Sequence, residues 1–539
     1  MDSRINNVLL LVISLCIILF VRGVSLGGEN KSKSPIPDAP SPANIEMNTS
    51  LKSMGLSVKE SIIYALRNNF DIEITRLDTK KTDADITTAK SVFDPVFKLT
   101  GNMQNNETPS ANILQTGTTT TGPTIITPIV AQGKTADALI QSLTPTGAIV
   151  SLEYNLFRNF LDPSAFQLLN PYYQNYFQAA ITQPLLKGAG WFYTMSPIYI
   201  ARNNKKISLA QFKTTAIEVA NAVQGAYWSY VQAIDFLRVS KKSLDRAEDL
   251  LRKNKIQVET GTLAPIEIVD AEAGVASRVE TVINAENAIR DREDELKKVM
   301  HLADNNIISD ATIMPSDKPV FEPKTIELKD TLKIAMERRP ELHGLHLQVE
   351  NAGMQTRRKK NELYPQLDFT GGVRYSGLGG KDTKMGGFQG DNYIPPDDFQ
   401  GEFFGLVLSI PIGNRSARSQ YNKAKTTEQQ ANMSVGKMEL DIVVEVRESV
   451  RQVMTNIERV KATKKARELA EKRLEVEEKK YSVGRSTNLE ILRQQEGLAI
   501  AEGEETKAII DYEISLGNLE KAKGTILEAY DIKLDEEKG

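Results

Sequence analysis

Few side chains in this sequence have the types and spacing that a reaction or a metal site requires. His343 and His346 lie three residues apart in a predicted helix, a spacing that can hold a metal ion, but no carboxylate or cysteine constellation completes the pair. No Ser-His-Asp arrangement, phosphate-binding loop or pair of catalytic acids stands out. We therefore predict that the protein is not an enzyme and holds no metal ion or cofactor.

The charged residues with the most informative spacing follow a short turn near the C-terminal end. Residues 482–488 (Ser-Val-Gly-Arg-Ser-Thr-Asn) separate two helical patterns, and Glu490 and Arg493 come next, three residues apart. At that spacing on a helix an arginine can pair with the glutamate and neutralise it. An earlier turn, Thr-Gly-Thr at 260–262, has the same distance from its glycine to a glutamate, Glu267. Each glycine suits the left-handed backbone position that ends a helix.

Two long predicted helices position the turn at residues 482–488. Between Gln420 and Leu527, apolar residues recur at steps of three and four, which keeps an apolar stripe on one face of each helix. No proline occurs after Gln420 to force a kink. The first arm, from Ser416 to Tyr481, is roughly 100 Å long at ~1.5 Å per residue. No globular domain needs a helix of that length.

A similar order of helices is predicted earlier in the chain. The predicted helices there cover residues 57–92, 197–259, 263–301 and 326–364. The first of them begins with Ser57 as N-cap and Glu60 three residues later, which is the capping-box spacing. Laid end to end, the short helices 57–92 and 263–301 roughly span the long helix that lies between them in the sequence.

Strands are predicted where the apolar period changes from 3.6 to 2, which gives each strand an apolar and a polar face. The four that we count are residues 97–103, 176–183, 366–375 and 404–410. Residues 139–143 are a candidate hairpin partner for the alternating segment 148–156, and the sequence leaves open whether that hairpin joins the other four strands. Stretches rich in Thr, Gly and Pro at 108–135 and 377–398 are predicted as surface loops.

The predicted strands have the length of membrane β-strands but are too few to close a barrel. The smallest known membrane barrels have about eight strands, and an open sheet edge cannot face lipid. We therefore expect the chain to assemble with cyclic symmetry, in which a trimer gives twelve strands. The long helices would then form a second tube below the barrel. The alternative is a soluble coiled-coil rod with a small β-domain.

The chain divides into a signal peptide, a Pro/Ser-rich linker, a first repeat, a second linker, a second repeat and a polar tail, at residues 1–27, 28–55, 56–301, 302–325, 326–530 and 531–539. The signal peptide is predicted because Arg4 precedes an apolar run that is followed by small residues. An uncleaved membrane anchor is the alternative. The repeat is predicted because Pro95 aligns with Pro365 and Gly261 with Gly484.

Composition excludes two further classes. The formal net charge of −3 provides no basic footprint for nucleic acid. The single cysteine, Cys16, excludes an internal disulfide framework. Charged residues at 25% and aromatic residues at 6% are typical of long solvated helices.

With these motifs in order, the chain resembles the TolC-like outer-membrane efflux proteins. The resemblance covers Leu56 to about Tyr530 and rests on residues 56–69, their copy around Ala335, the strand exits at 183–185 and 409–411, and the two turns. It implies a homotrimeric channel without enzymatic activity. Each chain would give four strands to a 12-stranded β-barrel in the lipid of the cell outer membrane, continuous with a long α-helical barrel in the periplasm. The implied partners are a periplasmic adaptor protein and an inner-membrane transporter.

The resemblance also assigns residues to sites. The two turns would form the periplasmic tip that meets the adaptor, through Gly261, Thr262, Gly484, Arg485 and Ser486. Glu490 matches the first of two acidic residues that line a constriction in family members. Arg493 stands where the second acid would be, which is a departure from the family pattern.

Two further inferences follow from the same motifs. Proline cannot donate a hydrogen bond to a continuing ladder, so the junction between barrel and tunnel is predicted at Pro95, Pro184, Pro365 and Pro411. The alternative function is that of a periplasmic coiled-coil adaptor or structural protein of an export machine. An adaptor would have one helical hairpin flanked by small β-domains, whereas this sequence predicts two hairpins, each preceded by amphipathic strands.

Overall fold

The computed structural model describes residues 53–109, 128–162, 167–304, 307–308, 311–382 and 393–534. The predicted signal peptide, nearly all of the first linker and the last five residues of the predicted tail lie outside these ranges. Of the described residues, 53–54 and 311–314 belong to one compact unit and the others to a second. Strands β1 (Ser53–Leu56) and β8 (Thr312–Pro315) pair as a two-stranded sheet. The other elements belong to the second unit.

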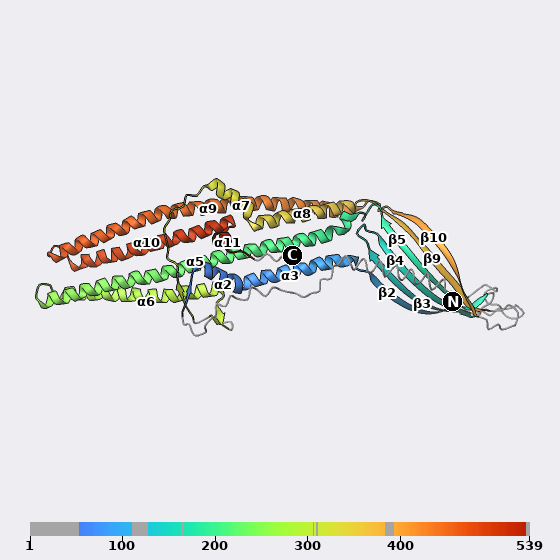
Figure 1. The fold of residues 1–539 in the computed structure, drawn as a ribbon, viewed down its shortest axis with the longest axis horizontal. Helices are drawn as coiled ribbons and strands as arrows, with labels where there is room; N and C mark the ends of the chain where they lie inside the picture. The colour runs from blue at the N-terminus through green and yellow to red at the C-terminus, as the bar shows by residue number, and fades with distance from the viewer. Residues whose placement is uncertain are drawn as a thin grey trace. The chain divides into compact units, whose positions relative to one another are not determined.

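Two helical hairpins make up most of the second unit (Figure 1). The first joins α5 (Trp191–Glu259) to α6 (Ile266–Met300), and the second joins α9 (Arg415–Ser482) to α10 (Asn488–Lys523). Helices α5 and α9 have 69 and 68 residues, so each is about 100 Å long at ~1.5 Å per residue. The long hairpins predicted from the apolar spacing are therefore confirmed.

Helix α5 begins at Trp191, before the predicted start, and carries Pro197 inside it. Proline lacks the N–H that would bond to the carbonyl of Tyr193, four residues earlier. The hydroxyl of Ser196 donates to that carbonyl instead, at 3.0 Å. The predicted start at Pro197 is wrong because a neighbouring side chain replaces the missing donor.

The predicted helices 57–92 and 326–364 are each interrupted at one residue, Asn69 and Arg339. They form α2 (Val58–Asn68), α3 (Phe70–Lys90) with the short helix η1 (Ser91–Phe93), α7 (Leu328–Arg338) and α8 (Pro340–Asn361). The predicted capping box is confirmed, with Ser57 as N-cap. The predicted continuity is wrong, because Asn69 and Arg339 are extended. Pro340 disfavours a helical Arg339, and the side chain of Asn69 accepts a hydrogen bond from the Asp71 N–H at 2.8 Å, which caps α3.

Among the described residues, six strands form one antiparallel sheet, in the order β10-β9-β5-β4-β3-β2. The strands are β2 (Val96–Pro109), β3 (Pro128–Leu143), β4 (Ile149–Asp162), β5 (Leu169–Pro184), β9 (Gln366–Asp382) and β10 (Tyr393–Ser409). The expectation of four strands per chain is wrong, because the candidate hairpin is formed, as β3 and β4, and lies between β2 and β5. The strands also extend into both predicted loops, at residues 128–135, 377–382 and 393–398.

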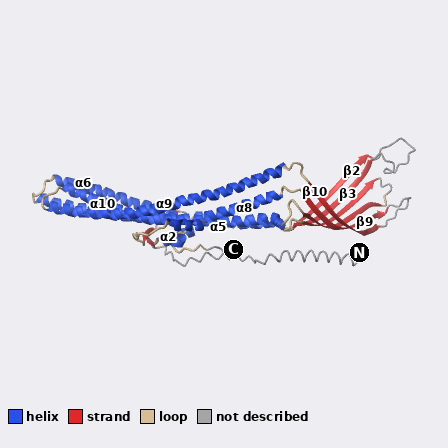
Figure 2. Cartoon of the chain, turned by 90° about the horizontal axis from the view of Figure 1, so that it is seen from above, coloured by secondary structure: helices blue, strands red, loops and turns tan. Residues whose placement is uncertain are grey.

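The contacts between helices show which helices are neighbours, both near the sheet and far from it. Helix α5 contacts α3 and α8 nearer the sheet and α6 and α10 farther from it, and α9 contacts α8 and then α10. The short helices are therefore stacked end to end beside α5 and α9, as their predicted lengths indicated. Figure 2 shows the strands at one end of these helices. The strands β2, β5, β9 and β10 that adjoin these helices follow the same order across the sheet.

One apolar core cluster lies mostly between the helices of the second hairpin, with Ala335 of α7 and Leu342 of α8 beside them. Its buried side chains on α9 are Ile442, Val446, Val450, Val453 and Val460, and those on α10 are Ala508, Tyr512, Leu519 and Ala522. These positions belong to the apolar spacing predicted from the sequence. Burying one such aliphatic side chain contributes about 1.5–3 kcal/mol, so the hairpin is held chiefly by this stripe.

Short elements complete the described chain. Strand β6 (Ala303–Asp304) pairs with β7 (Ile307–Ile308), and α11 (Ile526–Ala529) follows α10. No helix among those that the structure describes has both the length and the apolar content that crossing a membrane requires.

Candidate functional site

The two turns between the long helices share one backbone geometry. Gly261 and Gly484 have φ angles of +72° and +75°, so the predicted left-handed positions are confirmed. At the second turn the N–H of Gly484 donates to the Tyr481 carbonyl at 3.0 Å, and the N–H of Arg485 donates to the Lys480 carbonyl at 2.9 Å. This pair of bonds satisfies carbonyls that the end of the helix would leave without donors. It also reverses the chain within a few residues.

The first turn repeats the same bonds. The N–H groups of Gly261 and Thr262 donate to the carbonyls of Val258 and Gln257, at 3.0 and 2.9 Å. The hydroxyl of Thr262 also donates to the Gln257 carbonyl, at 2.9 Å. Both glycines are exposed, with no atom within 4 Å of where a Cβ would stand. The turns therefore require glycine for its backbone conformation and leave their outer surface open.

A side-chain hydrogen bond stabilises the second turn. The hydroxyl of Ser486 donates to the carboxylate of Glu477 at 2.5 Å. Hydrogen bonds from Ser486 and from Lys480 lower the pKa of Glu477, which therefore stays ionised near neutral pH. Arg485 is exposed at the turn. The predicted assignment of these turn residues to an adaptor contact stays a prediction.

Glu490 and Arg493 form the pair that their spacing predicts. The guanidinium of Arg493 donates to one Glu490 oxygen at 3.3 Å, and the amide of Gln494 donates to the other at 2.7 Å. The side chain of Arg493 is 68% exposed and that of Glu490 is 35% exposed. An ion pair this exposed contributes ~0–1 kcal/mol. The role of the two residues at a constriction stays a prediction.

Hydrogen bonds between the two hairpins are the part of this site that the sequence reasoning missed. The hydroxyl of Tyr481 on α9 donates to the side-chain oxygen of Asn254 on α5, at 2.8 Å. The amide of Asn488 on α10 donates to the backbone carbonyl of Glu267 on α6, at 3.1 Å. Both asparagines are buried, with exposed fractions of 0% and 1%. One signal was present in the sequence, because Asn254 continues the spacing of the buried residues Ala247 and Leu250 with a polar side chain.

Farther from the turns, the half-buried Arg278 joins the two hairpins. The guanidinium of Arg278 on α6 donates to the backbone carbonyl of Leu492 on α10 at 3.2 Å. It also bonds to the hydroxyl of Ser243 on α5 and to the carbonyl of Gly274 in its own helix, at 3.3 and 2.9 Å. Burial lowers the pKa of Arg278, but an arginine remains charged at any physiological pH.

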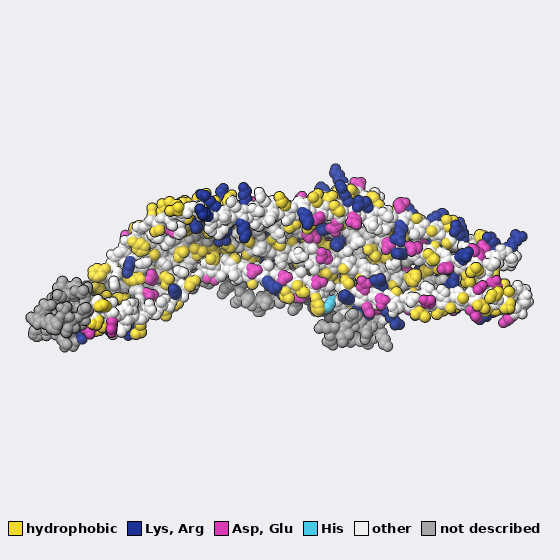
Figure 3. Space-filling view, turned by 180° about the vertical axis from the view of Figure 1, so that it is seen from behind, with side chains coloured by type: hydrophobic (Ala, Val, Ile, Leu, Met, Phe, Trp, Pro, Cys, Tyr) yellow, Lys and Arg dark blue, Asp and Glu magenta, His cyan; other side chains and the backbone are white. Residues whose placement is uncertain are grey.

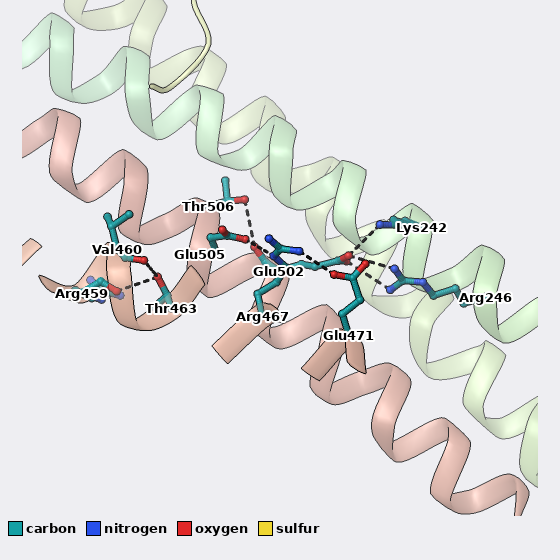
Figure 4. A network of polar contacts seen from close by, with 10 residues as sticks. All are labelled: Lys242, Arg246, Arg459, Val460, Thr463, Arg467, Glu471, Glu502, Glu505 and Thr506. Atoms are coloured by element: carbon teal, nitrogen blue, oxygen red, sulfur yellow. Dashed lines mark hydrogen bonds and ion pairs between the residues drawn. The ribbon is translucent and has the colours of Figure 1, made fainter. Parts of the chain in front are cut away.

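A charged network extends this connection along the helices (Figure 4). The carboxylate of Glu502 on α10 accepts hydrogen bonds from Lys242 and Arg246 on α5, at 2.9 and 3.1 Å. Three residues later on α10, Glu505 accepts a hydrogen bond from Arg467 of α9 at 2.8 Å. Glu502 therefore links the two hairpins, whereas Glu505 links the two helices of one hairpin.

The link through Glu502 should depend on pH. Burial alone would raise its pKa, but the hydrogen bonds from Lys242 and Arg246 outweigh burial and hold the pKa below the ordinary value of 4.5. A lowered pKa gives a contribution that is complete above the ordinary value and is lost as the pH falls through the lowered one. We expect the hairpins to separate more readily only below about pH 4, and Glu502→Gln to separate them at neutral pH.

Hydrogen exchange of the α5 and α10 amides checks this expectation, with Glu505→Gln as the matched control. The control removes the same charge from the same helix but leaves the link to α5 intact. Faster exchange in Glu502→Gln than in the control at pH 7 is expected. Equal exchange in the two variants would show that Glu502 does not hold the hairpins together.

The four predicted junction prolines all lie where a strand meets a helix or its connection. Pro95 precedes β2, Pro365 precedes β9, Pro184 is the last residue of β5, and Pro411 follows the end of β10. None lies in the middle of a strand or a helix, in agreement with the expected positions. Their role as the junction of a barrel with a tunnel stays a prediction.

The histidine pair considered first is exposed on α8. Within the described ranges, no group of three or more His, Cys, Asp or Glu side chains is placed to hold a metal ion. The site instead consists of two turns, an exposed charged pair and a set of hydrogen bonds between neighbouring hairpins.

Two long helical hairpins joined to one antiparallel sheet define a fold found in outer-membrane channels. The CmeC outer membrane channel of Campylobacter jejuni superposes with a TM-score of 0.58 and 15% identity, covering 87% of this chain and 86% of that one. The outer membrane protein VceC of Vibrio cholerae superposes with a TM-score of 0.59 and 13% identity, covering 87% and 96%. At these identities the likeness concerns the fold.

The family is shown by sequence. The family model described as "Outer membrane efflux protein" matches residues 150–300 and 331–525, which is more than half of the chain. The chain belongs to this family, so the resemblance drawn from its motifs is confirmed. It is also 25% identical over 314 residues to the outer membrane protein TolC of Escherichia coli K12. That match covers 56% of this chain and 60% of the TolC chain, about three fifths of that relative's length.

Proposed function

We propose that the protein is the outer-membrane channel of a tripartite efflux or secretion system and gives substrates a passive exit. The observation that carries the proposal is the open sheet. Among the described strands, β2 and β10 each pair on one side only. In lipid, such an edge would leave backbone N–H and C=O groups without partners. Three copies joined edge to edge in a ring would remove every open edge.

The layer of helices supports the same assembly. Apolar side chains are exposed on α9 at one flank of the layer and on α3 and α6 at the other: Met433, Leu440 and Val444, then Ile74, Leu77, Val269 and Ile283. Placed side by side in a ring, three copies would cover them. Figure 3 shows charged side chains of both signs interspersed over the helices on the face that it draws. Such a surface suits the aqueous periplasm.

The tip formed by the two turns is the proposed contact with a periplasmic adaptor, through which an inner-membrane transporter would deliver substrates. Val483, Leu489 and Ile266 are large apolar side chains exposed at or just after the turns. Val483 adjoins Gly484 in the sequence, and Ile266 and Leu489 each follow a turn glycine by five residues. An exposed apolar cluster of this kind suits the contact with another protein.

Native mass spectrometry of the detergent-extracted mature protein tests the proposal. We expect a complex of three chains that forms ion-conducting pores in planar bilayers, because the open edges can be paired only between copies. The same preparation without detergent should aggregate. A monomer that stays in solution without detergent, or a trimer that forms no pores, would contradict the proposed channel.

A further inference from the structure

We infer that the hairpin β3–β4 is part of the barrel wall, so that three copies close a barrel of eighteen strands, six from each chain. Such a barrel gives a wider exit than the twelve-stranded barrel that the resemblance implies. This inference rests on the proposed trimeric channel. It concerns the size of the exit, which follows from the inserted hairpin.

In the part of the sheet nearer the helices, the apolar face continues through the inserted hairpin, and farther along the same face the hairpin carries Lys134 paired with Arg158. Residues that pair directly in neighbouring strands point to the same face of a sheet. One such row runs through Phe97, Ile140, Leu152, Ala179 and Val373. A second row runs through Leu99, Ala138, Tyr154, Phe177 and Tyr375. The hairpin therefore presents apolar side chains on the same side as the strands that flank it.

The opposite face is largely polar in the same strands, and its side chains bond across the boundary of the hairpin. The hydroxyl of Tyr176 on β5 donates to the carboxylate of Glu153 on β4, at 2.7 Å. The guanidinium of Arg374 on β9 lies over the Tyr176 ring, 3.9 Å from its centroid. Within the hairpin, the amide of Asn155 donates to the carboxylate of Asp137. Membrane barrels place apolar side chains toward lipid and polar ones toward the lumen, so this face is the interior.

These two faces distinguish a wall from a plug or a flap. A hairpin folded into the lumen would have both faces in water and would not need an apolar row in register with its neighbours. The pairing from β2 through β5 also runs without a register shift. A bulge or bend, which would turn the hairpin out of the wall, is therefore not present in these pairings.

The number of strands also suits closure. All the pairings are antiparallel, so with six strands the two edges, β2 and β10, run in opposite directions. The β10 edge of one copy can then pair with the β2 edge of the next copy in the same antiparallel way. A pair of strands can be inserted without changing this relation, whereas a single added strand would reverse it.

The inserted hairpin widens the exit by a calculable amount. Barrel diameter grows roughly linearly with the number of strands, and barrels of 16–18 strands leave a water-filled channel. Eighteen strands in place of twelve give a diameter about 1.5-fold larger and a cross-section roughly twofold larger. The interior carries amides, hydroxyls and charges of both signs, Asp137 and Glu153 beside Lys98 and Arg374. This lining suits large hydrated solutes, polypeptides included, without selecting them by charge.

Polymer exclusion measures the width directly. The full chain is compared in planar bilayers with a variant that lacks residues 128–162, which lets β2 meet β5 with both faces preserved. Graded poly(ethylene glycol) is added on the extracellular side, and both proteins are checked as trimers by native mass spectrometry. We expect the full chain to admit polymers with a hydrodynamic radius about 1.5-fold larger. Equal exclusion limits in two trimeric channels would overturn the inference and leave the channel itself standing.

Cysteine labelling of the full chain keeps the test decisive if the shortened variant does not fold. Leu156→Cys and Asn155→Cys are neighbours on β4 with opposite faces. We expect Leu156→Cys to react with a lipid-soluble maleimide and Asn155→Cys with a water-soluble one applied from outside. If the water-soluble reagent labels both positions equally in a conducting trimer, β4 is not in the wall. If no trimeric pore forms at all, the proposed function fails and this inference fails with it.

Discussion

Tyr481→Phe is expected to raise the conductance of the channel, because it removes a hydrogen bond between the two hairpins close to the turns. The Tyr481 hydroxyl donates to Asn254 at 2.8 Å, and Asn254 is fully buried, so its oxygen would lose a donor that water does not readily replace. Such a loss costs about 1 kcal/mol or more per chain. If three chains open together, the losses add to ~3 kcal/mol, about a hundredfold in the ratio of open to closed states.

Single-channel recording at neutral pH measures this effect. Ser482→Ala is the matched control. The Ser482 hydroxyl donates to the Lys479 carbonyl of the same helix, at 2.8 Å, so its removal leaves the bond between the hairpins intact. Asn254→Ala should act in the same direction as Tyr481→Phe, and the double variant should add little to either one, since both changes remove the same bond. A Tyr481→Phe channel that conducts like the control would show that this contact does not keep the tip closed.

The features of the fold that the sequence predicts are those set by neighbouring residues. A glycine that ends a helix in the left-handed position needs only its own helix, so Gly261 and Gly484 are found where they are expected. The apolar stripe of α9 is read from its spacing because each member faces the same side of one helix. The ion pair of Glu490 with Arg493 is equally local, one turn of helix apart.

The features that the sequence reasoning missed depend on which elements become neighbours. Strand β3 is rich in Gly, Ala, Thr and Gln near its start, and its alternation is too weak to identify a strand. Its identity comes from pairing with β2 and β4 on both sides. The spacing around Glu502 shows which face of α10 it occupies, but the approach of α5 with Lys242 and Arg246 is set by the packing of two hairpins.

Arg493→Glu is expected to have the second large effect, provided that Glu490 and Arg493 face the axis of the trimer. The two side chains pair at 3.3 Å and stay partly exposed, so in a closed ring of three chains they can line the narrowest part of the tip. Arg493→Glu would then replace three pairs by six carboxylates around one axis. Like charges at helical i,i+3 spacing repel within a chain, and repulsion between chains adds to it. We expect the closed tip to be destabilised and the pore to become more selective for cations.

Conductance and reversal potential in planar bilayers separate these contributions. Arg493→Gln removes the positive charge without adding a negative one, so it should give a smaller rise in conductance than Arg493→Glu. Raising the salt from 0.1 to 1 M shortens the screening length from about 10 to about 3 Å. The difference between the two variants should therefore shrink, because repulsion across the axis is screened first. If both variants conduct like the unmodified chain at every salt concentration, the pair lies on the outer side of α10 and the constriction is formed by other residues at the tip.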